Sequence, residues 1–240
     1  MKTEVCVALL AIASVVSGCS SGTPLREADR ARLVAEPQVI LAHRPPRLSL
    51  SVFTDETTSA ERWGAAFGPA GLGVGVMKSM SDAQKLGARF IGAFGLTDPV
   101  TTVEERFMSA AATHGLGAVR AVAEPVPSAD GPELRQRFGD STVLVLRTYA
   151  WLIARGRDAH RYATLYRAEA SLVRGRDGVA VWSATCPAQA PGFADPATQP
   201  TLAELTANGG ELLRARFAER ASACADYLLD LFFGHHGPAG

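Results

Sequence analysis

The sequence predicts an α+β domain built on a single mixed or antiparallel sheet, with helices packed on one face. Three observations predict this class. The chain has 240 residues, 47% of them apolar and 20% charged, which is typical of a globular protein with one domain or two. Strand-like and helix-like segments alternate in its first half, in the order β-α-β-α. Three strand-like segments and a final helix follow, in the order β-β-β-α.

The first strand is expected at residues 48–53, where apolar residues and Ser alternate after a Pro-Pro pair. The first helix is expected at residues 98–115. Asp98 can cap it, Pro99 suits its first turn, and Gly115 is a natural stop. Its expected buried stripe consists of Val100, Val103, Phe107 and Ala111.

A second strand is expected at residues 118–126, and one or two helical turns at 132–138. The strongest strand signals come next, from segments rich in β-branched and aromatic residues, at 142–154, 162–173 and 179–185. The turn at 174–178 contains Asp-Gly, which favours a hairpin. Because the links are short, we expect these three strands to form an antiparallel meander.

A long helix is expected to close the domain. Thr201 and Glu204 form a capping box at its start, and Gly234 ends it. The sequence Asn208-Gly209-Gly210 should break or kink it. The apolar residues beyond this point share one face, namely Phe217, Ala221, Cys224, Leu228 and Leu231.

Residues 63–96 are unusually rich in glycine, and each glycine lowers helix stability by about 1 kcal/mol relative to alanine. The segment does not match a phosphate-binding loop, because that motif requires glycine directly before Lys-Ser and Met77 precedes Lys78-Ser79 here. We expect tight helix packing to explain the glycines. A segment that touches the membrane or a sister copy is the alternative.

The first 19 residues have the composition of an export signal. Residues 5–16 form an apolar run that is too short to span about 30 Å of hydrocarbon as a helix. Small residues and a cysteine follow, as Val16-Ser17-Gly18-Cys19. This motif resembles the lipobox of bacterial lipoproteins. The resemblance implies cleavage before Cys19 and acylation of Cys19, with fatty acids such as palmitate. An ordinary secretory signal is the alternative.

Ser20 follows the cysteine, at the place where Asp retains lipoproteins in the inner membrane of enterobacteria-like systems. It therefore resembles an outer-membrane sorting signal, which implies a lipid-anchored protein of the cell envelope that faces the periplasm. We expect a signal peptide, a lipidated tether, one periplasmic domain and a flexible tail, at residues 1–18, 19–47, 48–234 and 235–240. Ser, Gly and Pro at the ends of the tether are poor core material, although a short helix can form around 27–34.

The cysteines predict a disulfide between Cys186 and Cys224. Of the four cysteines, Cys6 leaves with the signal peptide and Cys19 carries lipid if the lipobox resemblance holds. Disulfides persist in exported proteins. Cys186 ends the expected meander and Cys224 lies on the apolar face of the final helix, so the two should meet. The absence of a C-x-x-C motif gives the bridge a structural role. Two buried free thiols are the alternative.

No catalytic constellation stands out in the sequence. None of the five histidines has zinc-ligand spacing, and no G-x-S-x-G motif is present, so we expect no metal and no cofactor. Glu104 and Glu105 lie in the first turns of the expected helix, where acidic residues interact favourably with the helix dipole. A pair of catalytic carboxylates is the alternative. Lys plus Arg and Asp plus Glu both number 24, so the neutral chain has no broad footprint for nucleic acid.

Aromatic residues gather on the expected meander, where core packing is the main expectation and a ligand- or sugar-binding face the alternative. They are Tyr149, Trp151, Tyr162, Tyr166 and Trp182. The element order loosely resembles periplasmic accessory lipoprotein domains, such as those of the curli export lipoprotein and of lipoprotein activators of peptidoglycan synthases. This topological resemblance carries no function.

The sequence is best interpreted as a membrane-anchored envelope lipoprotein that acts as a non-enzymatic adaptor or accessory protein for a protein or cell-wall partner. An oligomeric component of a secretion or export device is the first alternative, with residues 63–96 contacting membrane or sister subunits. An enzyme with a dispersed site is the second. The oligomeric state stays open.

Overall fold

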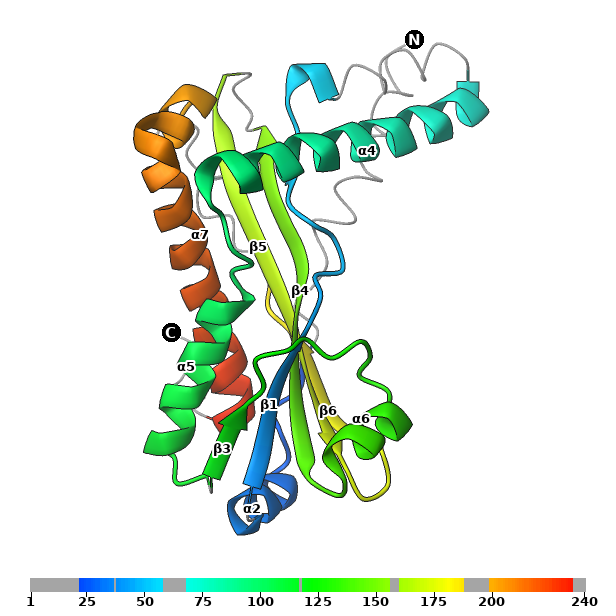
Figure 1. The fold of residues 1–240 in the computed structure, drawn as a ribbon, viewed down its shortest axis with the longest axis vertical. Helices are drawn as coiled ribbons and strands as arrows, with labels where there is room; N and C mark the ends of the chain where they lie inside the picture. The colour runs from blue at the N-terminus through cyan, green and yellow to red at the C-terminus, as the bar shows by residue number, and fades with distance from the viewer. Residues whose placement is uncertain are drawn as a thin grey trace.

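Two long neighbouring strands form the centre of a six-stranded mixed sheet in the computed structural model (Figure 1). The structure describes residues 22–36, 38–57, 68–116, 118–155, 160–187 and 199–234. The strands are β1 (Gln38–Arg44), β2 (Ser51–Val52), β3 (Ala118–Ala121), β4 (Thr142–Arg155), β5 (Tyr162–Arg174) and β6 (Val179–Thr185). The helices are α2 (Glu27–Ala35), α4 (Gly68–Phe94), α5 (Val100–Thr113), α6 (Gly131–Phe138) and α7 (Leu202–Phe233).

The strand order is β3-β1-β4-β5-β6, with β2 paired to β4. The three strands β4, β5 and β6 form the expected antiparallel meander. Strands β1 and β2 lie one after the other along the other edge of β4, both parallel to it, and β3 runs parallel to β1. The predicted α+β class with one mixed sheet is therefore confirmed.

Strand β1 lies inside the segment that was expected to be a tether, and this expectation was wrong for residues 38–44, which form a central strand. The short helix expected around residues 27–34 is present as α2 and packs against the domain. The continuous apolar run of Val39, Ile40, Leu41 and Ala42 is buried on both faces, as in parallel strands covered from two sides. The strand expected at 48–53 shrinks to the short β2.

The amino-terminal end of the described chain is held against the domain. Gly22 forms a β-bridge with Ala184 of β6. The carbonyl oxygen of Thr23 accepts a 2.8 Å hydrogen bond from Nε1 of Trp182, and Leu25 donates its backbone N–H to Leu231. A methyl group at Gly22 would lie 2.7 Å from a side-chain carbon of Leu231, so the chain packs tightly here.

The helices divide over the two faces of the sheet. The main core joins α5, α7 and the end of α4 to one face of the sheet. A smaller cluster packs Leu134 of α6 and Val126 against the other face. The expectation that the helices lie on one face therefore holds for α5 and α7, whereas α6 covers part of the opposite face. The sheet's short apolar stretch there, around Val143 and Val145, needs this cover.

Helix α7 follows its sequence signals. The Thr201–Glu204 capping box is present, and Gly234 ends the helix with a left-handed conformation at φ +74°. The backbone leaves helical geometry at residues 207–210, which confirms the predicted kink. The expected buried stripe is confirmed in α7, and so is that of α5. The amide of Val100 donates to Oδ1 of Asp98 at 3.0 Å, so Asp98 caps α5 as predicted.

Helix α4 occupies most of the glycine-rich segment. Its main contacts among the described elements are with β2 and α7, which its carboxyl-terminal part reaches. Figure 1 shows that its amino-terminal part extends beyond the edge of the sheet. In the described part of the chain, no helix combines the length and the apolar character that crossing a bilayer requires.

Candidate functional site

A hollow of about 480 Å³ lies between α2 and the hairpin of β5 and β6, at the opposite end of the sheet from α4. Leu33, Leu172 and Val181 supply apolar wall, and the rim is charged. The charged and polar lining residues are Asp29, Arg32, Glu36, Thr142, Arg174 and Arg176. This volume is in the range of small-molecule sites.

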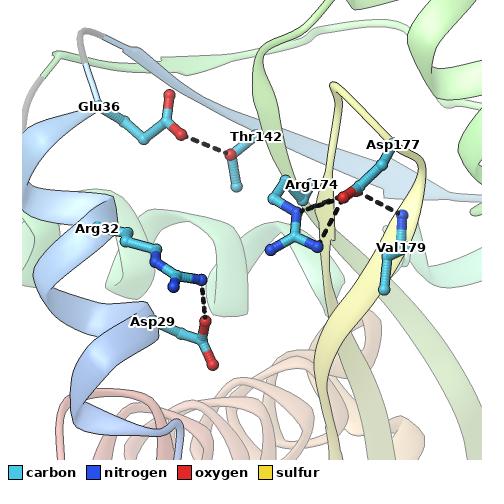
Figure 2. A network of polar contacts seen from close by, with 7 residues as sticks. All are labelled: Asp29, Arg32, Glu36, Thr142, Arg174, Asp177 and Val179. Atoms are coloured by element: carbon cyan, nitrogen blue, oxygen red, sulfur yellow. Dashed lines mark hydrogen bonds and ion pairs between the residues drawn. The ribbon is translucent and has the colours of Figure 1, made fainter.

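Two ion pairs border the hollow, one on each wall. Figure 2 shows the Arg32–Asp29 pair on α2 facing the Arg174–Asp177 pair on the hairpin. Nε of Arg174 donates to both carboxylate oxygens of Asp177, at 3.0 and 2.9 Å. This hydrogen bonding lowers the pKa of Asp177 and raises that of Arg174. The hairpin turn predicted at 174–178 therefore borders the hollow with an ion pair whose side chains are held in place by hydrogen bonds.

Glu36 connects α2 to the sheet at the edge of the hollow. Its Oε1 accepts a hydrogen bond of 3.3 Å from the hydroxyl of Thr142, the first residue of β4. The lining residues offer guanidinium and carboxylate groups but include no histidine or cysteine. The hollow can therefore bind a small ligand that carries both charges, and it supplies none of the usual nucleophile–base pairs.

A second polar cluster lies where the start of α5 meets the sheet. The hydroxyl of Thr148 bonds to the carboxylate of Asp98 and lies 3.1 Å from the hydroxyl of Tyr166. Burial raises the pKa of Asp98, against the opposing effects of the bonds to Thr148 and Val100. Burial also raises the pKa of Tyr166. This chain of hydroxyls ties α5 to β4 and β5.

His43 and Glu104 lie together beside this cluster, with 3.5 Å between Nδ1 and Oε2. Burial raises the pKa of Glu104, and the neighbouring His43 lowers it. The sequence placed Glu104 on a helix but could not place His43, which lay in the expected tether. The continuous apolar run at residues 39–42, just before His43, was the signal that could have found it. The described residues contain no group of three or more His, Cys, Asp or Glu side chains placed to hold a metal.

The sequence-predicted cysteine pair is joined in the structure. Cys186 and Cys224 form a disulfide with 5.3 Å between their Cα atoms. Both side chains are buried, and Sγ of Cys186 also accepts a 3.2 Å hydrogen bond from the amide of Ala168. The bridge fastens α7 to the end of β6. Cys19 lies outside the described residues.

Most of the meander's aromatic residues serve the core. Trp151, Tyr162, Tyr166 and Trp182 are buried, which agrees with the packing expectation. Tyr149 differs, because it is half-buried and has two guanidinium groups over its ring.

The glycine-rich segment contributes one close contact and one exposed surface. A methyl group at Gly87 would lie 1.7 Å from the carbonyl oxygen of Leu50, so the glycine lets α4 approach the chain next to β2. This favours the packing explanation for Gly87. Met77, further toward the start of α4, is 68% exposed.

No known protein family matches the chain, and no curated protein matches it. Among solved structures it is similar to PelC dodecamers from Paraburkholderia phytofirmans, with 13% identity for both. The first has a TM-score of 0.28, and the match covers 85% of this chain and 94% of the PelC chain. The second has a TM-score of 0.27, and the match covers 84% of this chain and 92% of the PelC chain. It is also similar to the lipoprotein GNA1162 from Neisseria meningitidis, with 19% identity, a TM-score of 0.24, and 62% and 80% coverage. These low values assign no function to the chain.

Proposed function

We propose that the chain is a lipid-anchored envelope lipoprotein that acts as a non-enzymatic adaptor, binding a second protein through the projecting part of α4. The single observation that carries the proposal is the reach of α4 beyond the sheet. A helix with several glycines is weak by itself, and most helical stability in proteins comes from packing. A partner on the projecting part would supply that packing.

The other features support the envelope setting of this proposal. The lipobox-like motif ending at Cys19 supports an anchor, and Ser20 supports outer-membrane sorting with the domain facing the periplasm. The disulfide of Cys186 and Cys224 suits an oxidising compartment. An exposed Met is typical of surfaces that adapt to a partner, because its side chain is flexible and polarisable.

Photo-crosslinking in cells tests the proposal. A photo-reactive amino acid replaces Met77 in the full chain, and the matched control carries it at Val179 on β6. Both positions are exposed, at 68% and 48%, but only the first lies on α4. We expect one dominant product from position 77, identified by mass spectrometry as a different protein. A product made only of copies of this chain would instead support the oligomeric export component. Equal, diffuse products at both positions would contradict both.

The hollow favours a second candidate, binding of a cell-wall fragment. Facing Arg–Asp pairs suit a short peptide with free amino and carboxyl groups, as in the stem peptides of peptidoglycan. Co-sedimentation of the detergent-extracted chain with purified peptidoglycan tests this. We expect Arg32→Gln to reduce the bound fraction, while Arg89→Gln, an exposed change on α4, leaves it unchanged. No co-sedimentation of the unaltered chain would contradict the candidate.

A further inference from the structure

A row of charged side chains crosses the middle of the sheet. Arg44 of β1 and Arg147 of β4 are direct partners in the parallel ladder, and Glu169 of β5 is the direct partner of Arg147. Like charges placed opposite each other destabilise a sheet. One carboxylate, 3.7 Å from the Arg147 guanidinium, compensates only part of this repulsion.

Two more arginines join this row around an aromatic ring. The guanidinium carbons of Arg47 and Arg167 lie 4.8 and 5.0 Å from the ring centroid of Tyr149. The ladder between β4 and β5 is irregular between Thr148 and Ala150, and a bulge of this kind re-aims side chains. We call Arg44, Arg47, Arg147 and Arg167 the arginine face; Arg44 and Arg147 are ladder partners, and Arg47 and Arg167 lie over the Tyr149 ring.

Backbone carbonyls hold three of the four arginines in place. Nε of Arg147 donates to the carbonyl oxygen of Pro45 at 3.1 Å, and Nε of Arg167 donates to that of Cys186 at 3.3 Å. Arg44 donates to the carbonyl oxygen of Pro127 at 3.5 Å. These bonds are to neutral groups, so they orient the guanidiniums without neutralising them. The positive charges are therefore preorganised.

The arginine face has more positive charge and more donors than the described residues satisfy. Glu169 forms an ion pair with Arg147, and the buried Nε of Arg44 has no hydrogen-bond partner among the described residues. Burial lowers the pKa of Arg147, and the charge of Arg44 lowers it further. The protein therefore keeps a costly arrangement at a partly exposed position, which is typical of a binding site.

We propose that the arginine face binds the phosphate group of an anionic ligand. Guanidinium forks match phosphate geometry, and arginine is the preferred residue for phosphate recognition. Phosphate suits the face better than a carboxylate, because its additional oxygen and negative charge can accept hydrogen bonds from several guanidiniums at once. The phosphate can belong to a soluble phosphate ester or to a lipid headgroup, since both present the same oxygens.

Calorimetric titration of the full chain in neutral detergent, at fixed ionic strength, tests the proposal. The probes are pyrophosphate, short-chain dihexanoyl phosphatidylglycerol, and citrate as a polycarboxylate control. We expect saturable binding of at least one phosphate probe, and weaker binding of citrate. Tighter pyrophosphate binding would identify a soluble ligand, and tighter lipid binding a headgroup.

Two variants and a matched control locate the site. Arg47→Gln changes an exposed residue and should leave the fold intact, whereas Arg147→Gln removes the centre of the row. Each should weaken phosphate binding by about tenfold, the scale of one hydrogen bond to a charged group. Arg89→Gln on α4 removes the same charge elsewhere and should change nothing. The proposal is overturned by no saturable phosphate binding, by equally tight citrate binding, or by an equal loss in Arg89→Gln.

Discussion

Gly87 of α4 and the carbonyl of Leu50 approach so closely that a methyl group on the glycine would lie 1.7 Å from the carbonyl oxygen. The obstacle is backbone, which cannot swing aside as a flexible side chain can. We expect Gly87→Ala to displace α4 and to lower the free energy of unfolding by about 1–3 kcal/mol, the usual cost of overpacking. Urea unfolding followed by circular dichroism measures this.

Gly92 provides the control for this prediction. It lies in the same helix, and a methyl group there would meet nothing within 4 Å. Gly92→Ala should therefore raise stability by up to about 1 kcal/mol, because alanine favours the helix. If both variants were stabilised alike, the close packing of α4 against the chain at Leu50 would be refuted.

The pH dependence of stability should report the buried carboxyl of Asp98. Burial raises its pKa in the folded state above the ordinary 3.8. The folded state then binds the proton more tightly, so this contribution to stability is full below about pH 4 and is lost as pH rises through the raised pKa. Asp98→Asn keeps Oδ1 as the acceptor of the bonds from both Val100 and Thr148 and removes the titrating group. We expect the variant to gain on the order of 1 kcal/mol over the parent between pH 4 and pH 7.

Urea titrations of both proteins at the two pH values measure this difference. Glu105→Gln is the control, because Glu105 is exposed on the same helix. A stability difference between parent and Asp98→Asn that stays constant with pH would show that Asp98 does not titrate in this range.

Removal of the disulfide should destabilise the domain. The bridge joins residues 38 positions apart, and closing such a loop stabilises by about 4 kcal/mol in the chain-entropy model. The double variant Cys186→Ala, Cys224→Ala should lose up to this amount in urea unfolding. Alkylation of the unreduced, denatured protein followed by intact mass tests the bridge itself. Two alkylated cysteines, Cys186 and Cys224, would show that it does not form in cells.

Cys19 should carry the lipid anchor, and residues 1–18 should be absent from the mature protein. Metabolic labelling with a clickable fatty acid and intact mass test the two parts. Cys19→Ser should abolish the label, because no other residue of the motif has a thiol. Label that persists in this variant would place the acyl chain elsewhere or reject acylation at the motif.

The second half of the fold was readable in the sequence because its signals are local. The β4–β5–β6 meander, the Thr201–Glu204 box and the kink at 207–210 each follow from a few neighbouring residues. The first half was not. Strand β1 has no hydrogen-bond partner near it in sequence, since it pairs with β3 and β4 more than 70 positions away, and prolines beside it favoured a linker.

The candidate sites were hidden for the same reason. Arg44 and Arg147 become neighbours only through the pairing of β1 with β4, and Arg32 faces Arg174 only after α2 folds against the hairpin. Arginines scattered along a neutral chain indicate no cluster. The helix α4 was obscured by glycine propensity, which tertiary contact at Leu50 outweighs.

The docking of Gly22 on β6 has a consequence for reach. Only three peptide units separate Gly22 from Cys19, and they span at most about 11 Å when extended. A lipid on Cys19 would then hold the edge of the sheet close to the headgroups. The linker would be too short for the domain to move far from the membrane. Such a protein would meet only partners that come to that same leaflet. The distance it could reach from the membrane would be set by the size of the folded domain and not by the length of a linker.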